Sequence, residues 1–500
     1  MDLVTHLAHG FSIAVTPLNL TYCLFGVTLG TLIGVLPGIG PAATLAMLLP
    51  MTFSLSPVTS LIMLAGIYYG SQYGGSTTAI LINTPGEASS VVTTLDGYQM
   101  ARRGRAGAAL GVAAIGSFAA GSVATLVVAL FAPPLSSVAL SFGAPEYFSL
   151  MVFGLMGAMV LASGSLLRSL GMVLLGLAVG LVGPDINSGK LRFTYGIEDL
   201  FDGINVVVVA MGLFAFAEIV ANLEHGEKRE TFTKAVRGLL PSREDLKRIV
   251  APVLRGTAIG SLLGVLPGGG PLLASFAAYT VEKKVADDAS RFGQGAIEGV
   301  AAPEAANNAG AQTSFIPLLT LGIPTSATMA LMLGAMTMQG INPGPQVLTK
   351  SPDLFWGMIA SMWIGNAMLV ILNLPLIGIW IRLLSVPYRL LYPAILVFCC
   401  IGLTSLDNRV FDVHAAAVFG LAGYLLFKLG CEPAPFLLGF ILGPGLEENL
   451  RRALVLSRGD PSVFITQPIS AALLLASVAM LAMVVGPAVR KWRTEVFREG

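Results

Sequence analysis

Gly30-Thr-Leu-Ile-Gly34-Val-Leu-Pro37-Gly38-Ile-Gly40-Pro41 recurs 230 residues further along the chain as Gly260-Ser-Leu-Leu-Gly264-Val-Leu-Pro267-Gly268-Gly-Gly270-Pro271. Each copy lies within a block of apolar residues. Proline removes a backbone donor and glycine relaxes the backbone, so we expect a helix to break at each Pro-Gly-x-Gly-Pro. In hydrocarbon such a break is tolerated only where protein or a water-filled cavity covers it. The repeat therefore predicts two similar tips, one in each half of the chain, whose unpaired main-chain groups are available to a ligand; an ordinary helix kink is the alternative.

The composition of the whole chain indicates an integral membrane protein. Of its 500 residues, 55% are hydrophobic and only 11% are charged, whereas a soluble domain carries about 25% charged residues. Residues 3–86, 305–349, 354–381 and 461–489 contain no Asp, Glu, Lys or Arg. A helix that crosses a bilayer core of about 30 Å needs about 20 apolar residues. We therefore expect an all-α polytopic membrane protein with about twelve transmembrane helices in two inverted repeats, some of them re-entrant or broken.

Charge divides the chain and predicts its orientation. The interval 224–255 holds eight Lys and Arg residues, and loops rich in these residues lie on the cytoplasmic side. We predict a first transmembrane repeat over 1–223, a charged cytoplasmic linker over 224–255 and a second repeat over 256–460. Residues 461–500 should form a C-terminal transmembrane helix and a basic cytoplasmic tail.

The two repeats are expected to be inverted relative to each other. The first 17 residues contain no Lys or Arg, so the N-terminus is expected outside, and the two copies then enter the membrane from opposite sides. Many secondary transporters have this architecture. A weaker echo follows each copy, because Asn83-Thr-Pro85 resembles Gly322-Ile-Pro324 in pattern and position.

Uncharged polar residues follow the first tip. The run Tyr68–Thr78 is dense in hydroxyls, amides and glycines, and Asn83-Thr84-Pro85 comes next. Hydroxyl and carbonyl oxygens can replace the water around a desolvated Na⁺. Close helix packing through small residues is the alternative. We take Ser76 and Thr77 as candidate substrate ligands, and Asn83 and Thr84 as candidates for ion coupling.

A second polar stretch belongs to the other half of the chain. Asn307 and Asn308 are adjacent amides at membrane depth, and a buried amide without a partner costs a few kcal/mol. They bind either neighbouring helices or a substrate and ion. Glu304 precedes the uncharged residues 305–349, and is either a proton or cation site or a helix-end residue at the interface. The full candidate set comprises Gly38, Gly40, Ser76, Thr77, Gly268, Gly270, Asn307, Asn308, Thr325 and Ser326 for the substrate, and Asn83, Thr84, Glu304 and Gln312 for ion coupling.

Missing motifs exclude several functions. The sequence contains no phosphate-binding Gly-x-x-x-x-Gly-Lys-Ser/Thr, no His-Glu-x-x-His and no Gly-x-Ser-x-Gly. Four scattered histidines and few buried acids do not supply a nucleophile, a base and an orienting group, so we expect no enzyme, catalytic residue or cofactor. The net charge of +1 without a basic patch argues against nucleic acid. The four cysteines lack metal-ligand spacing. We expect the energy for any transport by this chain to come from an ion gradient.

Several motifs together resemble a known family. They are the paired Gly-Val-Leu-Pro-Gly-x-Gly-Pro segments, the run from Tyr68 to Pro85, the segment from Pro303 to Pro324 and the loop Arg192-Phe-Thr-Tyr-Gly196. Over nearly the whole chain the sequence is similar to the TctA family, the large membrane subunits of tripartite tricarboxylate transporters.

The resemblance implies a permease of the bacterial inner membrane that takes up citrate or a related carboxylate, driven by Na⁺ or protons. It also implies two partners, a small four-helix membrane subunit and a periplasmic solute-binding protein. A stand-alone carboxylate transporter and an ion channel remain as alternatives. On this basis Asn308→Ala is expected to abolish uptake and to leave expression intact.

Overall fold

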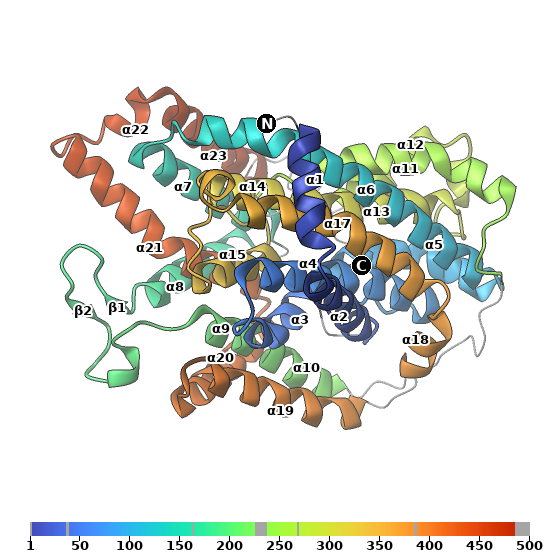
Figure 1. The fold of residues 1–500 in the computed structure, drawn as a ribbon, viewed down its shortest axis with the longest axis horizontal. Helices are drawn as coiled ribbons and strands as arrows, with labels where there is room; N and C mark the ends of the chain where they lie inside the picture. Colours follow the sequence, from blue (N-terminus) through green and yellow to red (C-terminus); the bar gives the residue numbers. More distant parts are fainter. Residues whose placement is uncertain are drawn as a thin grey trace.

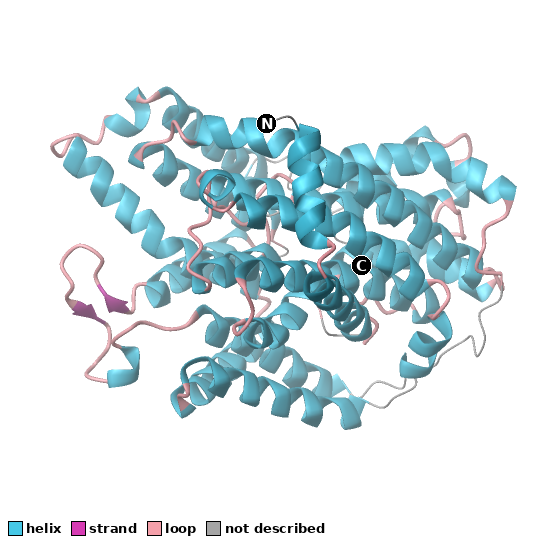
Figure 2. Cartoon of the chain, in the orientation of Figure 1, coloured by secondary structure: helices cyan, strands magenta, loops and turns pink. Residues whose placement is uncertain are grey.

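The chain folds into a bundle of helices with a single two-stranded hairpin among the described residues (Figure 2). A computed structural model describes residues 3–36, 40–162, 165–225, 238–267, 270–384 and 388–485. The predicted tip residues Gly38 and Gly268 and the basic C-terminal tail lie outside the described residues. This architecture is the all-α membrane protein that the composition predicts.

The elements run along the chain as Figure 1 labels them. The first half comprises α1 (Leu3–Ala14), α2 (Pro17–Gly34), α3 (Pro41–Leu48), η1 (Leu49–Thr52), α4 (Pro57–Ile82), η2 (Ala88–Ser90), α5 (Val91–Arg102), α6 (Ala106–Ala139), α7 (Ala144–Leu161), α8 (Leu166–Gly180), β1 (Gly183–Pro184), β2 (Leu191–Arg192), η3 (Glu198–Leu200), α9 (Val206–Ala210), the π-helical η4 (Met211–Phe216) and α10 (Ala217–His225). The second half comprises α11 (Arg243–Leu263), α12 (Gly270–Val285), η5 (Ala289–Arg291), α13 (Glu298–Thr313), α14 (Phe315–Leu321), α15 (Ala327–Met338), α16 (Val347–Lys350), α17 (Pro352–Asn373), α18 (Ile377–Leu384), α19 (Tyr388–Asp407), α20 (Val410–Lys428), α21 (Pro433–Leu456), α22 (Val463–Thr466) and α23 (Pro468–Val485).

Several helices are suited to a bilayer by length and composition. Among the described residues, five are long and apolar enough to cross a membrane: Pro17–Gly34, Ala106–Ala139, Val206–Glu224, Pro352–Asn373 and Val410–Lys428. Shorter apolar helices such as α3 and α15 are also present. The chain is therefore a multi-pass membrane protein, and the number of about twelve spans stays a prediction.

The sequence repeat is also a repeat in helix packing. A Cβ atom at Gly30 of α2 would lie 2.2 Å from the Ile67 carbonyl oxygen of α4, and one at Gly260 of α11 would lie 2.3 Å from the Ala306 carbonyl oxygen of α13. The neighbouring glycines at spacings of four residues pack in the same way, and they are Gly26, Gly34, Gly256 and Gly264. Small residues let membrane helices approach this closely. The two halves therefore repeat one arrangement, α2–α3–α4 and α11–α12–α13; its inversion stays a prediction.

The partner helices α4 and α13 lie at the centre of the molecule. Every residue from Thr59 to Leu81 and from Gly299 to Thr313 is buried. Both helices are rich in Ser, Thr, Asn, Gln and Gly rather than in leucine. A buried polar helix needs hydrogen-bond partners, so the protein surrounds these two helices and shields them from lipid.

The weaker sequence similarity between Asn83-Thr-Pro85 and Gly322-Ile-Pro324 also has a structural basis. Asn83 ends α4 with φ +57°, and Gly322 ends α14 with φ +69°. Asparagine and glycine are the residues that tolerate this left-handed conformation. A proline follows two positions later in both copies, so the chain leaves both helices in the same way.

Helix α11 begins inside the segment predicted as a linker. Ser242 caps it, because its Oγ accepts a hydrogen bond from the Asp245 amide (3.1 Å) and Asp245 accepts one from the Ser242 amide (3.2 Å). This reciprocal cap satisfies two amides at the helix start. The second part of the interval 224–255 is therefore helical from Arg243 onward, and its assignment as a cytoplasmic linker stays a prediction.

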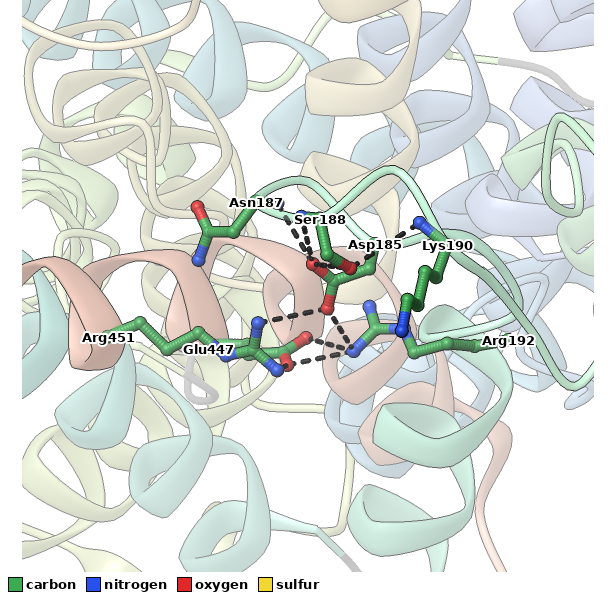
Figure 3. A network of polar contacts seen from close by, with 7 residues as sticks. All are labelled: Asp185, Asn187, Ser188, Lys190, Arg192, Glu447 and Arg451. Carbon is green, nitrogen blue, oxygen red and sulfur yellow. Dashed lines mark hydrogen bonds and ion pairs between the residues drawn. The ribbon is translucent and has the colours of Figure 1, made fainter.

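The β1–β2 hairpin projects from one end of the molecule (Figure 1) and is bound to α21 by an ion network (Figure 3). Arg192 donates to both carboxylate oxygens of Glu447 (2.8 and 3.0 Å), and Arg451 donates to Asp185 (2.9 Å). The Ser188 amide, which donates to Asp185 (2.7 Å), holds the pKa of Asp185 well below its usual range, and Asn187 and Arg451 lower it further. The network fixes the turn of the hairpin against the helix.

Candidate functional site

The two tips bound one cavity. Pro41 at the start of α3 and Gly270 and Pro271 at the start of α12 line the same cavity of about 260 Å³. This volume lies just below the range of about 300–1,000 Å³ that is usual for small-molecule sites. The remaining wall consists of Tyr68, Gln72, Glu87, Ala88, Ser89, Ala158, Ala162, Leu272, Ser326, Ala327, Thr328, Glu432, Ala434, Pro435 and Leu438. Two interruptions 230 residues apart in sequence therefore meet at a common space.

Each tip presents the start of a helix. Gly40 caps α3, and its amide donates a hydrogen bond to the carboxylate of Glu218 on α10. Gly270 begins α12 with φ +37°, and nothing lies within 4 Å of where its Cβ atom would be. Amides at the start of a helix attract anions. The contact between Gly40 and Glu218 is an example of this preference within the chain.

Ser326 is a second predicted residue on the cavity wall. It caps α15, with its Oγ accepting a hydrogen bond from the Met329 amide (3.3 Å). A third helix start therefore faces the cavity beside the two tips. Thr325, the preceding residue, is fully buried, and its hydroxyl has no hydrogen-bond partner among the described residues.

The segment after α4 folds back onto it and carries Glu87 inside. A Cβ atom at Gly86 would lie 2.5 Å from the Cα atom of Gly75, so only glycine permits this approach. Glu87 is then 6% exposed and lines the cavity. Its Oε1 accepts a hydrogen bond from the Asn307 amide on α13 (2.8 Å). The contact joins residues from both halves of the chain.

Glu304 is the centre of a second polar cluster behind the cavity. It is 1% exposed, and its two carboxylate oxygens accept hydrogen bonds from Ser76 on α4 (2.7 Å) and Thr93 on α5 (2.5 Å). Ser76 and Glu304, predicted separately from the two halves, therefore lie together. Of the two alternatives considered for Glu304, a helix end at the interface does not fit this deeply buried position within α13.

The other predicted residues occupy different places. The Asn308 amide donates to Ser117 Oγ on α6 (2.6 Å), and Thr77 bonds the Tyr73 carbonyl of its own helix (3.3 Å). Gln312 is 1% exposed, with its Oε1 unpartnered among the described atoms. Asn83 is exposed at the end of α4 and Thr84 is half-buried. None of these five residues is part of the cavity wall given above.

The cavity is acidic. Glu87 and Glu432 belong to its lining, which includes no Lys, Arg or His among the described residues. Keeping an ion inside a protein without a partner costs several kcal/mol. The buried carboxylate of Glu87 therefore requires a proton or a cation.

Sequence reasoning missed Glu87 and Gln72 as wall residues. Glu87 ends the uncharged stretch 3–86 just as Glu304 begins another, so the argument that selected Glu304 also applies to Glu87. Gln72 lies within the quoted polar run, where spacing alone does not separate it from its neighbours. No comparable sequence pattern marks Glu432 or the wall residues of α21, which are Ala434, Pro435 and Leu438.

Comparison with known proteins identifies the family of the chain. The model of the tripartite tricarboxylate transporter TctA family matches residues 20–438. An uncharacterized 52.8 kDa protein in the TAR-I ttuC' 3' region of Agrobacterium vitis is 61% identical over 499 residues, covering 100% of this chain and 99% of that protein. An uncharacterized protein in the TAR-II ttuC' 3' region of the same organism is 61% identical over 240 residues, covering 48% of this chain and 99% of that protein. No solved structure matches the chain. The chain therefore belongs to the tripartite tricarboxylate transporter TctA family.

Proposed function

We propose that this chain is the large permease subunit of a tripartite transporter, and that it takes up tricarboxylate or related carboxylate anions across the bacterial inner membrane, driven by an ion gradient. Membership of a transporter family supports the class of function. The observation that carries the proposal is the shared cavity, because both helix tips reach it. A substrate anion would meet the start of α12 from one half of the chain and Pro41 from the other.

The coupling ion would bind at the buried acids. Coupling to Na⁺ or protons is supported by carboxylates that lie inside the protein with hydroxyl and amide partners but no basic residue. A carboxylate substrate would be repelled by these groups unless a positive charge accompanied it. Anion and cation would therefore occupy neighbouring positions and move together.

The partners would be a small four-helix membrane subunit and a periplasmic solute-binding protein. The tripartite character of the family supports further subunits. We place the N-terminus outside and the charged interval 224–255 and the C-terminus in the cytoplasm, following the Lys and Arg bias.

Uptake by reconstituted vesicles tests the proposal. Labelled citrate and a panel of di- and tricarboxylates are supplied to vesicles that contain this chain, with Na⁺ and pH gradients imposed separately. We expect accumulation against the substrate gradient when one of the two ion gradients is present. Equilibration without accumulation would instead favour a channel.

The same vesicles separate the tripartite from the stand-alone mechanism. Uptake is measured with and without the small subunit and the solute-binding protein. Full uptake by this chain alone would favour a stand-alone carboxylate transporter.

A further inference from the structure

Glu87 combines burial with access to the cavity. Its side chain is 6% exposed and belongs to the cavity wall, and the Asn307 amide donates to it at 2.8 Å. Nearby on the same wall, Ser89 Oγ donates to Gln72 Oε1 (3.3 Å). Oxygen atoms of carboxylate, amide and hydroxyl groups thus gather at one place on the cavity surface.

Glu304 lies one helical turn before Asn307 on α13 and does not reach the cavity wall. Both of its carboxylate oxygens already accept hydroxyl hydrogen bonds, from Ser76 and Thr93. Glu87 and Glu304 interact electrostatically. The two acids therefore form a pair in which only Glu87 faces the space where a ligand can arrive.

Two further oxygen atoms around this pair lack partners among the described residues. They are Oδ1 of Asn307, which is 1% exposed, and the hydroxyl of Tyr73, which is 5% exposed and interacts with Glu304. Unpartnered buried polar atoms are rare and call for an explanation such as an absent ion. A hard monovalent cation takes oxygen ligands of these kinds.

We infer that Glu87, with Asn307, is the cavity-facing position at which the coupling cation, a proton or Na⁺, binds, and that Glu304 is the second acid of the same site. The inference rests on the proposed function and extends it to a residue and to an order of events. An anionic substrate that enters first meets the charge of Glu87, so the cation binds before the substrate. The titratable groups around Glu87 are Tyr68 and Tyr73 from α4, Glu304 from α13 and Glu432 beside α21.

Thermal melting of the full chain in detergent tests cation binding without any substrate. One arm titrates Na⁺ against choline at pH 8, and the other lowers the pH in choline without Na⁺. We expect one of the two arms to raise the melting temperature of the wild type by about 2 °C or more, which identifies the cation. Glu87→Gln, which keeps the shape of the side chain, should lose this shift.

Glu198→Gln is the matched control, because Glu198 is an exposed acid of η3. It should respond like the wild type. Glu87→Asp retains the charge and should keep part of the shift, which separates loss of the site from misfolding. An unchanged response in Glu87→Gln, or a wild type that responds in neither arm, would overturn the inference.

Vesicle transport gives a second readout. With labelled citrate, Glu87→Gln should lose gradient-driven accumulation but retain exchange of internal for external citrate, because exchange needs no net movement of the cation. Gradient-driven accumulation equal to that of the wild type would contradict the inference. If Glu87→Gln also loses citrate exchange, the cation-induced shift in the melting temperature of this variant, compared with that of the wild type, decides whether the cation site is lost. A wild type that transports no carboxylate would refute the proposed function instead. The melting temperatures, which are measured without substrate, would still test the cation site.

Discussion

At the residue scale, the two tip glycines that the structure describes differ in backbone conformation. Gly40 has φ −73°, which any residue adopts, whereas Gly270 has φ +37°, which L side chains rarely adopt. A Cβ atom at either position meets nothing within 4 Å. The difference between the two tips is therefore one of backbone strain rather than of space.

Gly270→Ala should accordingly impair transport more than Gly40→Ala. Left-handed backbone costs a non-glycine residue about 1–2 kcal/mol, which corresponds to roughly a tenfold change in the population of the tip conformation. Initial uptake rates at matched protein amounts measure the effect, with Gly40→Ala as the sterically tolerated control. Equal rates in the two variants would show that the conformation of Gly270 is not needed.

Asn308 provides a second test at this scale. We expect Asn308→Ala to abolish uptake at normal expression. The structure adds a competing role, because the Asn308 amide bonds Ser117 on α6 and the Glu304 carbonyl on its own helix, and loss of a buried partner costs about 1–3 kcal/mol. Ser117→Ala removes the first of these bonds without removing the amide. If both variants lose uptake equally and melt at lower temperature, Asn308 belongs to helix packing and not to the site.

At the scale of elements, the close contact between α2 and α4 depends on glycine. Gly30→Ala places a methyl group 2.2 Å from the Ile67 carbonyl oxygen, and Gly260→Ala places one 2.3 Å from the Ala306 carbonyl oxygen. Overpacking of this kind costs about 1–3 kcal/mol or more, so both variants should melt at lower temperature. Gly171→Ala on α8, where the added methyl group meets nothing within 4 Å, is the control. An unchanged melting temperature in Gly30→Ala would contradict the proposed role of these glycines in close packing.

The ion network of the β1–β2 hairpin gives a second prediction for an element. Arg451→Ala removes the hydrogen bond to Asp185 and the contact with Glu447, so residues 183–205 should be cleaved faster in limited proteolysis. Arg452→Ala, an exposed neighbour on the same helix, should leave the cleavage rate unchanged. Equal cleavage rates in the two variants would show that the network does not hold the hairpin.

The pH dependence of the same hairpin follows from Asp185. Because hydrogen bonding lowers the folded-state pKa of Asp185, its carboxylate stabilises the docked hairpin fully above the unfolded-state pKa of about 3.9. This contribution is lost progressively as the pH falls from that value toward the lower folded-state pKa. Hydrogen exchange corrected for intrinsic rates should show constant protection of residues 185–192 between about pH 5 and pH 8, and weaker protection below about pH 4. Protection that rises on acidification would contradict this assignment.

At the scale of the whole molecule, accessibility from the two sides of the membrane tests the predicted orientation of the chain. One apolar span, Val206–Glu224, separates the hairpin from the charged interval 224–255, so the two should lie on opposite sides of the membrane. In a background without Cys23, Cys399, Cys400 and Cys431, a cysteine at Ser188 should react with an impermeant maleimide from the periplasmic side. A cysteine at Lys247 should react only after permeabilisation. The reverse pattern would refute the predicted orientation.

Much of the architecture could be predicted because its causes are local. The Pro-Gly-x-Gly-Pro segments interrupt helices through the chemistry of their own backbone, and the uncharged blocks indicate apolar helices. The matching of Asn83 with Gly322 was also visible, because both residues favour the same left-handed helix end. The start of α11 does not follow from the hydrophobic pattern. This helix begins at Arg243 because Ser242 and Asp245 cap it.

The sequence by itself determined that the chain is a helical membrane protein with two matched breaks and two polar stretches, since residue type and spacing decide where a helix can span or stop. The tertiary structure decided which of these groups meet. Ser76 and Glu304 are 228 positions apart, and Glu87 and Asn307 are 220 positions apart. Contacts over such separations depend on how closely whole helices approach, and that approach is set by glycine contacts between α2 and α4 and between α11 and α13. The position of Glu87 on the cavity wall is therefore a property of the fold.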